Sequence, residues 1–289
     1  MVSKEGVNKR RVTLSADDYG LAPGVSCGIR ELLAAGRLTG TACMTGGPHW
    51  PDEAARLKTI HGENPFDVGV HLTLTEQPAI TDMPGLAPDG RLPGLGRLIG
   101  LALTGRIDRA EVAGELTAQI DRFEAAWGAP PDFLDGHHHA HQLPIVGDVV
   151  LDLYRTRLNP GRAWIRRCTA PLGRVLGTGV AVRRALVIGA LGRSFSRRLD
   201  RAGVVSNRVF AGVRDFTGEP PYATLVRNWL IGAPDGTLIM CHPGYVDDVL
   251  RAADSLTSPR EEELSYLISP EFPALLDELG MTLASPLRA

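Results

Sequence analysis

Aspartate, histidine and arginine side chains that could do chemistry follow a series of apolar, strand-like segments along this chain. They are Asp17, Asp18, His71, His137, His138, His139, His141, Arg166 and His242. Asp17 and Asp18 end the first such segment, and His242 follows Leu-Ile-Met-Cys near the other end of the chain. In α/β barrels the carboxyl ends of the strands converge on one face, where active sites are built. We therefore expect these residues, distant in sequence, to meet at one place.

An Asp-Asp pair near neutral imidazoles suits a divalent metal ion with mixed oxygen and nitrogen ligands. With an open coordination position, such an ion would lower the pKa of a water and polarise a substrate carbonyl. Adjacent residues of a regular strand point to opposite sides. Asp17 and Asp18 are therefore expected to lie in a loop at the strand end, one binding metal and the other acting as a base.

Each feature also has a purely structural interpretation. The Asp-Asp pair resembles a common turn, His71 could be a hydrogen-bonded core histidine, and His242 could be a turn residue. The four histidines of Asp-Gly-His-His-His-Ala-His, residues 135–141, are harder to explain structurally and favour metal binding. The three glutamates at residues 261–263 are expected to form a solvated helix face.

Strand-like and helical segments alternate along the chain, as expected for a parallel sheet with helical crossovers. The predicted strands are residues 11–16, 41–45, 67–75, 132–135, 163–166, 237–241 and 281–284. The predicted helices begin near residues 23 and 51 and cover 108–127, 145–157 and 260–280. Residues 78–96 are rich in glycine and proline and predict a long functional loop. The alternation alone does not distinguish a closed barrel from an open sheet.

The chain has 289 residues, of which 44% are hydrophobic and 22% charged, which is sufficient for a large core without disulfide bonds. The net charge of −2 offers no global attraction to nucleic acid or to a membrane surface. The four cysteines show no Cys-x-x-Cys spacing. No apolar segment precedes Arg11, and no apolar run is long enough to span a membrane. These features predict a cytoplasmic protein without a secretory signal or transmembrane helix.

Residues 162–208 are rich in arginine with apolar residues between them. One interpretation is a surface helical excursion whose arginines face water. The other is a lid or arm that meets an anionic or lipid-linked substrate.

Four motifs occur in a fixed order and carry a specific resemblance. They are Ala-Asp-Asp-Tyr-Gly at 16–20, Gly-Val-His-Leu-Thr-Leu-Thr at 69–75, Asp-Gly-His-His-His-Ala-His at 135–141 and Cys-His-Pro-Gly-Tyr-Val-Asp at 241–247. Together they resemble the YdjC-like carbohydrate deacetylases, a family that includes chitooligosaccharide deacetylase and the hopanoid-associated HpnK-like branch. The resemblance extends from about Arg11 to Ala284.

The resemblance implies one domain over residues 1–289, with a core at about 11–284, folded as a distorted (β/α) TIM-like barrel with a helical excursion around 170–205. It implies hydrolysis of N-acetyl groups on amino sugars and one divalent metal ion. Zinc or another transition metal is favoured, and magnesium also fits a hydrated site. An acetylated amino-sugar substrate, free or lipid-linked, and a homodimer are further implications.

Site residues are transferred by their positions in the motifs. Asp18, His71 and His137 would bind the metal, Asp17 would be the general base, and His242 would be the acid that protonates the leaving amine. Arg166 would either assist the oxyanion or orient Asp17. The predicted substrate-binding residues are His139 and Tyr245. Gly136 stands where chitooligosaccharide-type members often carry serine, and the lysine-containing histidine motif of the hopanoid branch is absent, so the identity of the glycan stays open.

Two other functional classes agree with part of this pattern. A metal-dependent phosphoesterase on a similar barrel would also use aspartate, histidine and arginine, but usually with ligands for further metals. A catalytically silent sugar-binding protein would not need Asp17.

Overall fold

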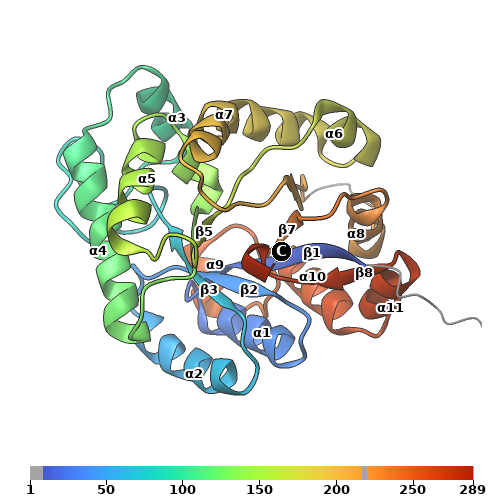
Figure 1. Ribbon diagram of the computed structural model, residues 1–289. Coiled ribbons are helices and arrows are strands. Elements are labelled where there is room, and N and C mark those ends of the chain that lie inside the picture. The colour runs from blue at the N-terminus through green and yellow to red at the C-terminus, as the bar shows by residue number, and fades with distance from the viewer. Residues whose placement is uncertain (1–8, 217–219, 289) are drawn as a thin grey trace, which may run out of the picture.

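A curled parallel sheet forms the centre of the computed structural model, which describes residues 9–216 and 220–288 (Figure 1). Its strand order is β5-β4-β3-β2-β1-β7-β6, and β8 pairs with the first residues of β1. The strands are β1 Arg10–Tyr19, β2 Gly40–Cys43, β3 Asp67–Leu72, β4 Phe133–Gly136, β5 Trp164–Ile165, β6 Val209–Ala211, β7 Thr237–Cys241 and β8 Met281–Leu283. All the strand pairs are parallel, as the predicted crossovers require.

The two ends of this sheet approach each other. Among the described residues no strand ladder joins β5 to β6, but hydrogen bonds link their flanking segments. The amide of Ile165 donates to the carbonyl of Val205, and the amide of Phe210 donates to the carbonyl of Thr169, each at 3.0 Å. The sheet therefore curls into an incompletely laddered barrel, which confirms the predicted distorted TIM-like α/β fold.

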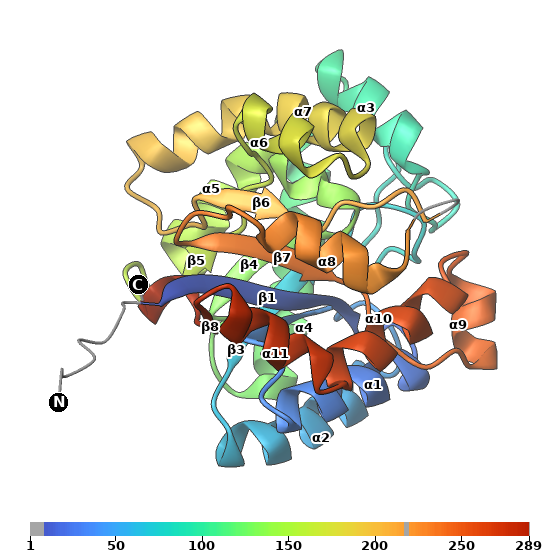
Figure 2. The ribbon, with the colours of Figure 1, turned by 90° about the vertical axis from the view of Figure 1, so that its right-hand side faces the viewer.

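Helices surround the barrel (Figure 2). They are α1 Pro23–Ala34, α2 Trp50–Glu63, α3 Leu95–Leu103, α4 Arg109–Trp127, α5 Val146–Arg157, α6 Leu172–Thr178, α7 Val182–Arg201, α8 Tyr222–Leu230, α9 Asp248–Ala253, α10 Ser258–Ile268 and α11 Glu271–Glu278, with 3-10 turns at His137–Gln142 and Pro286–Arg288. The helical excursion predicted around residues 170–205 is confirmed by α6 and α7.

The core is built mainly around the central strand. From Val12 onward every residue of β1 is buried, as expected for a strand covered on both faces. The main cluster of buried apolar side chains extends from Val12 to Met281. The sequence sets both ends of α4. At its N-terminus the Asp108 carboxylate accepts a hydrogen bond from the Ala110 amide, and at its C-terminus Gly128 has a φ of 84°.

The elements differ from the predictions at several places, and α3, α8 and α9 are helices that were not predicted. β6 was not predicted, because three residues bordering the arginine-rich segment carry almost no periodic signal. The single helix predicted over 260–280 is wrong, since α10 ends at Ile268 and α11 begins at Glu271. Pro270 explains the break, because the residue before a proline avoids the helical region and Ser269 has an extended ψ of 159°.

In the parts of the chain that the structure describes, no helix has the length and apolar character needed to cross a membrane. The prediction that no secretory signal is present rests largely on residues 1–8, which lie outside the described residues.

Candidate metal and catalytic site

A bulge at the end of β1 brings Asp17 and Asp18 to the same place. The strand continues through both aspartates to Tyr19, so the predicted position in a terminal loop is wrong. The pairing of β1 with β2 is irregular between Ala16 and Tyr19, and Asp18 has a φ of 69°. Such a bulge interrupts the strict alternation of side chains, and aspartate tolerates this left-handed conformation better than most residues. Both carboxylates therefore reach one site although they are neighbours on a strand.

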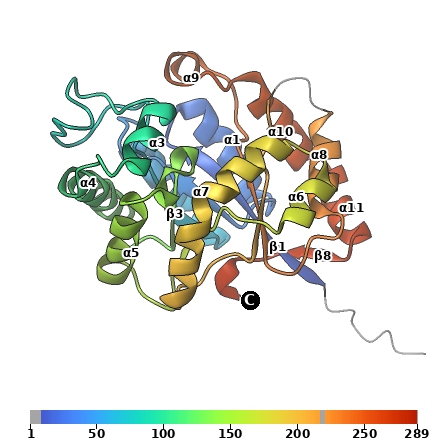
Figure 3. The same cartoon turned by 90° about the horizontal axis from the view of Figure 1, so that it is seen from above.

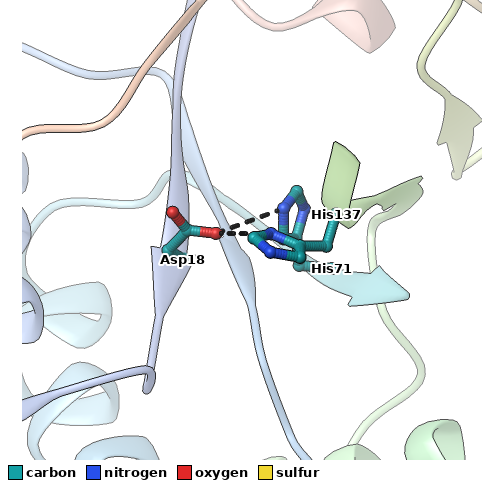
Figure 4. A group of neighbouring side chains, drawn as sticks. All are labelled: Asp18, His71 and His137. Carbon is teal, nitrogen blue, oxygen red and sulfur yellow. Dashed lines mark hydrogen bonds and ion pairs between the residues drawn. The ribbon is translucent and has the colours of Figure 1, made fainter. Parts of the chain in front are cut away.

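Asp18, His71 and His137 form a compact group of oxygen and nitrogen atoms that could bind a metal ion (Figure 4). Asp18 Oδ1 lies 3.4 Å from His71 Nε2 and 3.2 Å from His137 Nδ1. All three side chains are buried, and their ligand atoms lie within 4.8 Å of one another. One carboxylate and two imidazoles at this spacing fit a single divalent metal ion with room for a further ligand.

Asp135 orients His71 from behind. Its Oδ1 lies 2.7 Å from His71 Nδ1, so that Nδ1–H donates to the carboxylate and Nε2 faces Asp18. This carboxylate–imidazole arrangement is usual behind metal-binding histidines. Burial disfavours a charged imidazole, but the carboxylates of Asp135 and Asp17 outweigh it and raise the pKa of His71 to about 10. This role of Asp135 was not predicted, although Asp135 lies opposite His71 in the parallel register of β3 and β4.

Arg260 binds the other oxygen of Asp18. Its Nη2 lies 2.7 Å from Asp18 Oδ2 and 2.7 Å from Asp254 Oδ2, and its side chain is fully buried. Burial opposes ionisation of Asp18, but Arg260 and the nearby imidazoles hold its pKa well below the usual range. Asp18 Oδ1 therefore faces His71 and His137. Arg260 was not predicted, because it lies in a charged run that looks like an ordinary helix surface.

Arg166 makes a bidentate ion pair with Asp17. Its Nη1 lies 2.6 Å from Asp17 Oδ2, and its Nη2 lies 2.5 Å from Asp17 Oδ1 and 2.7 Å from Asp135 Oδ2. Burial raises the pKa of Asp17, but Arg166 outweighs it and lowers this pKa to about 2. Because both terminal nitrogens face carboxylates, the geometry favours the expected role of Arg166 in orienting Asp17 over a role at the oxyanion.

His242 lies beside Asp17, with 3.9 Å between His242 Nε2 and Asp17 Oδ2. Its amide donates to Glu263 Oε2 at 2.6 Å, and Glu263 Oε1 accepts from Arg214 Nη1 at 3.0 Å. Glu263 is 1% exposed. The prediction of a solvated face at residues 261–263 is therefore wrong for Glu263, because this carboxylate turns inward to hold the loop that carries His242.

Several of these side chains line a cavity of about 590 Å³. Asp17, Asp18, His71, His137 and His242 all line it. Its walls include apolar side chains of α3 and α7, namely Leu95, Ile99, Val187, Ile188 and Leu191. The site thus combines charged groups at its base with apolar walls, a common arrangement for binding sites of small molecules.

Residues 11–278 match the family described as YdjC-like protein. The chain belongs to the YdjC-like family. It is 31% identical to a carbohydrate deacetylase of Geobacillus stearothermophilus, over 95% of this chain and 96% of the relative. It is 29% identical to a chitooligosaccharide deacetylase of Klebsiella pneumoniae (strain 342), over 96% of this chain and 98% of the relative.

A solved structure supports the fold of this YdjC-like chain. A protein of Enterococcus faecalis V583, linked by its description to cellobiose-phosphate cleavage, superimposes with a TM-score of 0.71 at 21% identity. The match covers 96% of this chain and 98% of that one. At this level of identity the similarity establishes the barrel architecture.

The other histidines of this family member have different surroundings. His139 lines the cavity with its Nδ1 3.6 Å from Cys168 Sγ, and burial together with Arg166 lowers its pKa well below the usual value. His141 Nε2 lies 3.0 Å from the backbone oxygen of Arg166 and so holds that segment in place. Tyr245 is not among the residues that line the cavity; it is 42% exposed, and its hydroxyl donates to Glu31 Oε2 at 2.9 Å.

Proposed function

We propose that this chain is a metal-dependent deacetylase that hydrolyses the N-acetyl group of an N-acetylhexosamine unit in a glycan or glycolipid. The observation that carries the proposal is the convergence of Asp18, His71 and His137 beside Asp17 and His242 on one cavity floor. The carbohydrate deacetylases among the relatives support the same reaction and substrate class.

Asp18, His71 and His137 would hold one divalent metal ion. Two imidazole nitrogens and one carboxylate oxygen favour zinc or another transition metal over magnesium, which prefers oxygen ligands. When bound, the ion supplies Lewis-acid activation of the acetyl carbonyl and of water. Asp135 and Arg260 hold His71 and Asp18 in the orientation that this ion needs.

The proton transfers are assigned to Asp17 and His242. Asp17 is ionised and oriented by Arg166, so it accepts a proton from the water whose oxygen attacks the acetyl carbon. The C–N bond then breaks, the departing nitrogen takes a proton from His242, and acetate and a free amino sugar are released. The 3.9 Å separation of His242 Nε2 and Asp17 Oδ2 keeps both groups close to one reacting centre.

Phosphoester hydrolysis is less well supported. Asp17, His71 and Asp135 form a second group with metal-ligand spacing among the described residues. Arg166, however, lies 2.5 Å from Asp17 and 2.7 Å from Asp135. A guanidinium there occupies both carboxylates and would repel a second cation, whereas phosphoesterases of this kind usually need further metal ions.

Further features stay predictions. The resemblance implies a single deacetylase domain, substrate contacts of His139 and Tyr245, a lipid-linked substrate and a homodimer, and the sequence composition predicts a cytoplasmic location. Tyr245 would contact only a part of the glycan that extends beyond the cavity.

The proposal is tested by product analysis with two substrates. Metal-loaded protein is incubated with N-acetylglucosamine oligomers and, separately, with p-nitrophenyl phosphate, and both acetate and phosphate are assayed. We expect acetate from the oligomers and no phosphate. Phosphate release without acetate would favour the phosphoesterase, and neither product would favour a sugar-binding protein.

A further inference from the structure

Exposed apolar side chains gather on one face formed by α3, α6 and α7. Leu103, Leu172, Leu176 and Val187 are 61%, 55%, 55% and 59% exposed, respectively. The three helices lie along the same side of the molecule in all three ribbon views, as Figure 3 shows from above. From Val182 to Leu191, α7 has no buried side chain, although seven of these ten residues are apolar. Exposed apolar patches of this kind usually mark a binding surface.

The same face is strongly basic. Residues 171–199 contain six arginines and no aspartate or glutamate, whereas the whole chain has a net charge of −2. Arg183, Arg193 and Arg197 are exposed and have no carboxylate partner among the described residues. The net charge of the whole chain predicts no attraction to a membrane, but this face of the molecule is locally positive.

Apolar and basic side chains lie together along one side of α7. Arg183, Val187, Ala190 and Arg197 are separated by four, three and seven residues, so they share the exposed side of the helix. The remaining face of α7 packs inward through Phe195 and Leu199. An amphipathic helix with leucine and valine beside arginine is suited to lie in the interface of a lipid bilayer.

We propose that this α3–α6–α7 face docks on an anionic lipid bilayer. Its exposed leucines and Val187 would enter the boundary of the acyl chains, and the unpaired arginines would contact lipid phosphates. A second copy of the chain fits this face less well, because a two-fold contact would bring the same unpaired arginines near their equivalents. Arginine keeps its charge at all ordinary pH values, so this repulsion could not be relieved.

Docking in this orientation would bring the cavity to the lipid surface. Val187 both lines the cavity and is exposed on the face, and Leu95 and Ile99 of α3 line the cavity beside it. The apolar wall of the site is thus continuous with the proposed docking face.

Flotation of the full chain with lipid vesicles tests this proposal. We compare phosphatidylcholine vesicles with vesicles containing phosphatidylglycerol, at low and high salt. The chain is expected to float with the anionic vesicles and to be released by salt. The Arg193→Gln/Arg197→Gln variant should bind at least about tenfold more weakly, at about 1 kcal/mol per arginine. Lys58→Gln/Arg251→Gln removes two charges elsewhere and should bind as the wild type does.

The apolar contribution is tested in the same assay. Leu172→Ser/Leu176→Ser should lose binding, whereas Ile268→Ser, a residue on α10 that is 39% exposed, should not. Circular dichroism confirms that each variant is folded. Equal flotation of wild type and face variants, no flotation at all, or equal loss in the control variants would overturn the proposal. A wild-type dimer in light scattering that Leu172→Ser/Leu176→Ser dissociates would assign the face to a second copy instead.

Discussion

Arg166 binds both carboxylate oxygens of Asp17, at 2.6 and 2.5 Å, and one of the same nitrogens lies 2.7 Å from Asp135. One buried cation thus connects the proposed base to the carboxylate that orients His71. The orientation of the base and the orientation of a metal ligand are therefore coupled through a single side chain.

Arg166→Lys tests this coupling. Lysine keeps the positive charge but cannot hold two oxygens in a planar, bidentate contact. We expect turnover to fall about 10²-fold, the scale of loss when a catalytic group is displaced by about 1 Å. Initial rates of acetate release measure the effect. The neighbouring Arg167→Lys, which alters a pair with Asp200 at the surface, is the matched control, and wild-type turnover in Arg166→Lys would contradict the account.

Single substitutions of Asp18, His71 and His137 test whether these residues bind the metal ion. Asp18→Ala, His71→Ala and His137→Ala should each remove most of the bound metal, because each deletes one of the three proposed protein ligands. Elemental analysis after gel filtration gives the metal content. His49→Gln, a histidine outside this group, should keep it. Near-stoichiometric metal in all three alanine variants would show that the assignment is wrong.

His242→Ala should slow turnover without loss of metal. An acid that protonates a leaving amine matters less when that amine is weakly basic. The loss should therefore be smaller for an activated aryl acetamide than for an N-acetylglucosamine oligomer. Comparison of kcat for the two substrates measures this difference. An equal loss of kcat on both substrates would mean that His242 binds or orients the substrate. An unchanged kcat on both would mean that His242 is only a structural residue of the turn.

The ion pair of Arg11 and Asp235 predicts a pH-dependent contribution to stability. Hydrogen bonds from the Arg11 side chain and amide lower the pKa of Asp235 to about 2. Because the folded pKa is depressed, the stabilisation is present above the unfolded value and is lost as the pH falls toward 2. Both side chains are about one third exposed, so Asp235→Asn should cost at most about 1 kcal/mol at pH 7.

Urea unfolding of wild type and Asp235→Asn at pH 7 and at progressively lower pH measures this difference. The two free energies of unfolding should converge as the pH approaches 2. A difference that is constant with pH would exclude the ionised pair as its cause.

Candidate site residues at strand ends could be predicted from the sequence. The residues that orient them through hydrogen bonds could not. Asp18, His71 and His137 each end or follow an apolar strand, and parallel strands bring such positions together. Arg260 and Glu263 instead lie on α10 within a run of charged residues, which has the composition of a solvated helix. Their burial depends on contacts with Asp18 of β1 and with His242, which follows β7, and no local pattern encodes such distant contacts. The bulge at Asp18 was missed because it appears only in the register of β1 against β2.

The proposed mechanism requires Asp17 to remove a proton from water in a metal-dependent deacetylation, and the Asp17→Asn variant measures whether it does. Acetate release from N-acetylglucosamine oligomers and metal content are measured on the same samples of wild type and variant, before and after chelation and metal reloading. We expect wild-type activity to disappear on chelation and to return on reloading. Asp17→Asn should keep its metal. Its rate of acetate release should fall by at least about 10²-fold, the usual scale for loss of a general base. Wild-type acetate release by metal-loaded Asp17→Asn would exclude Asp17 as the base, and undiminished release by chelated wild type would exclude a metal-dependent reaction.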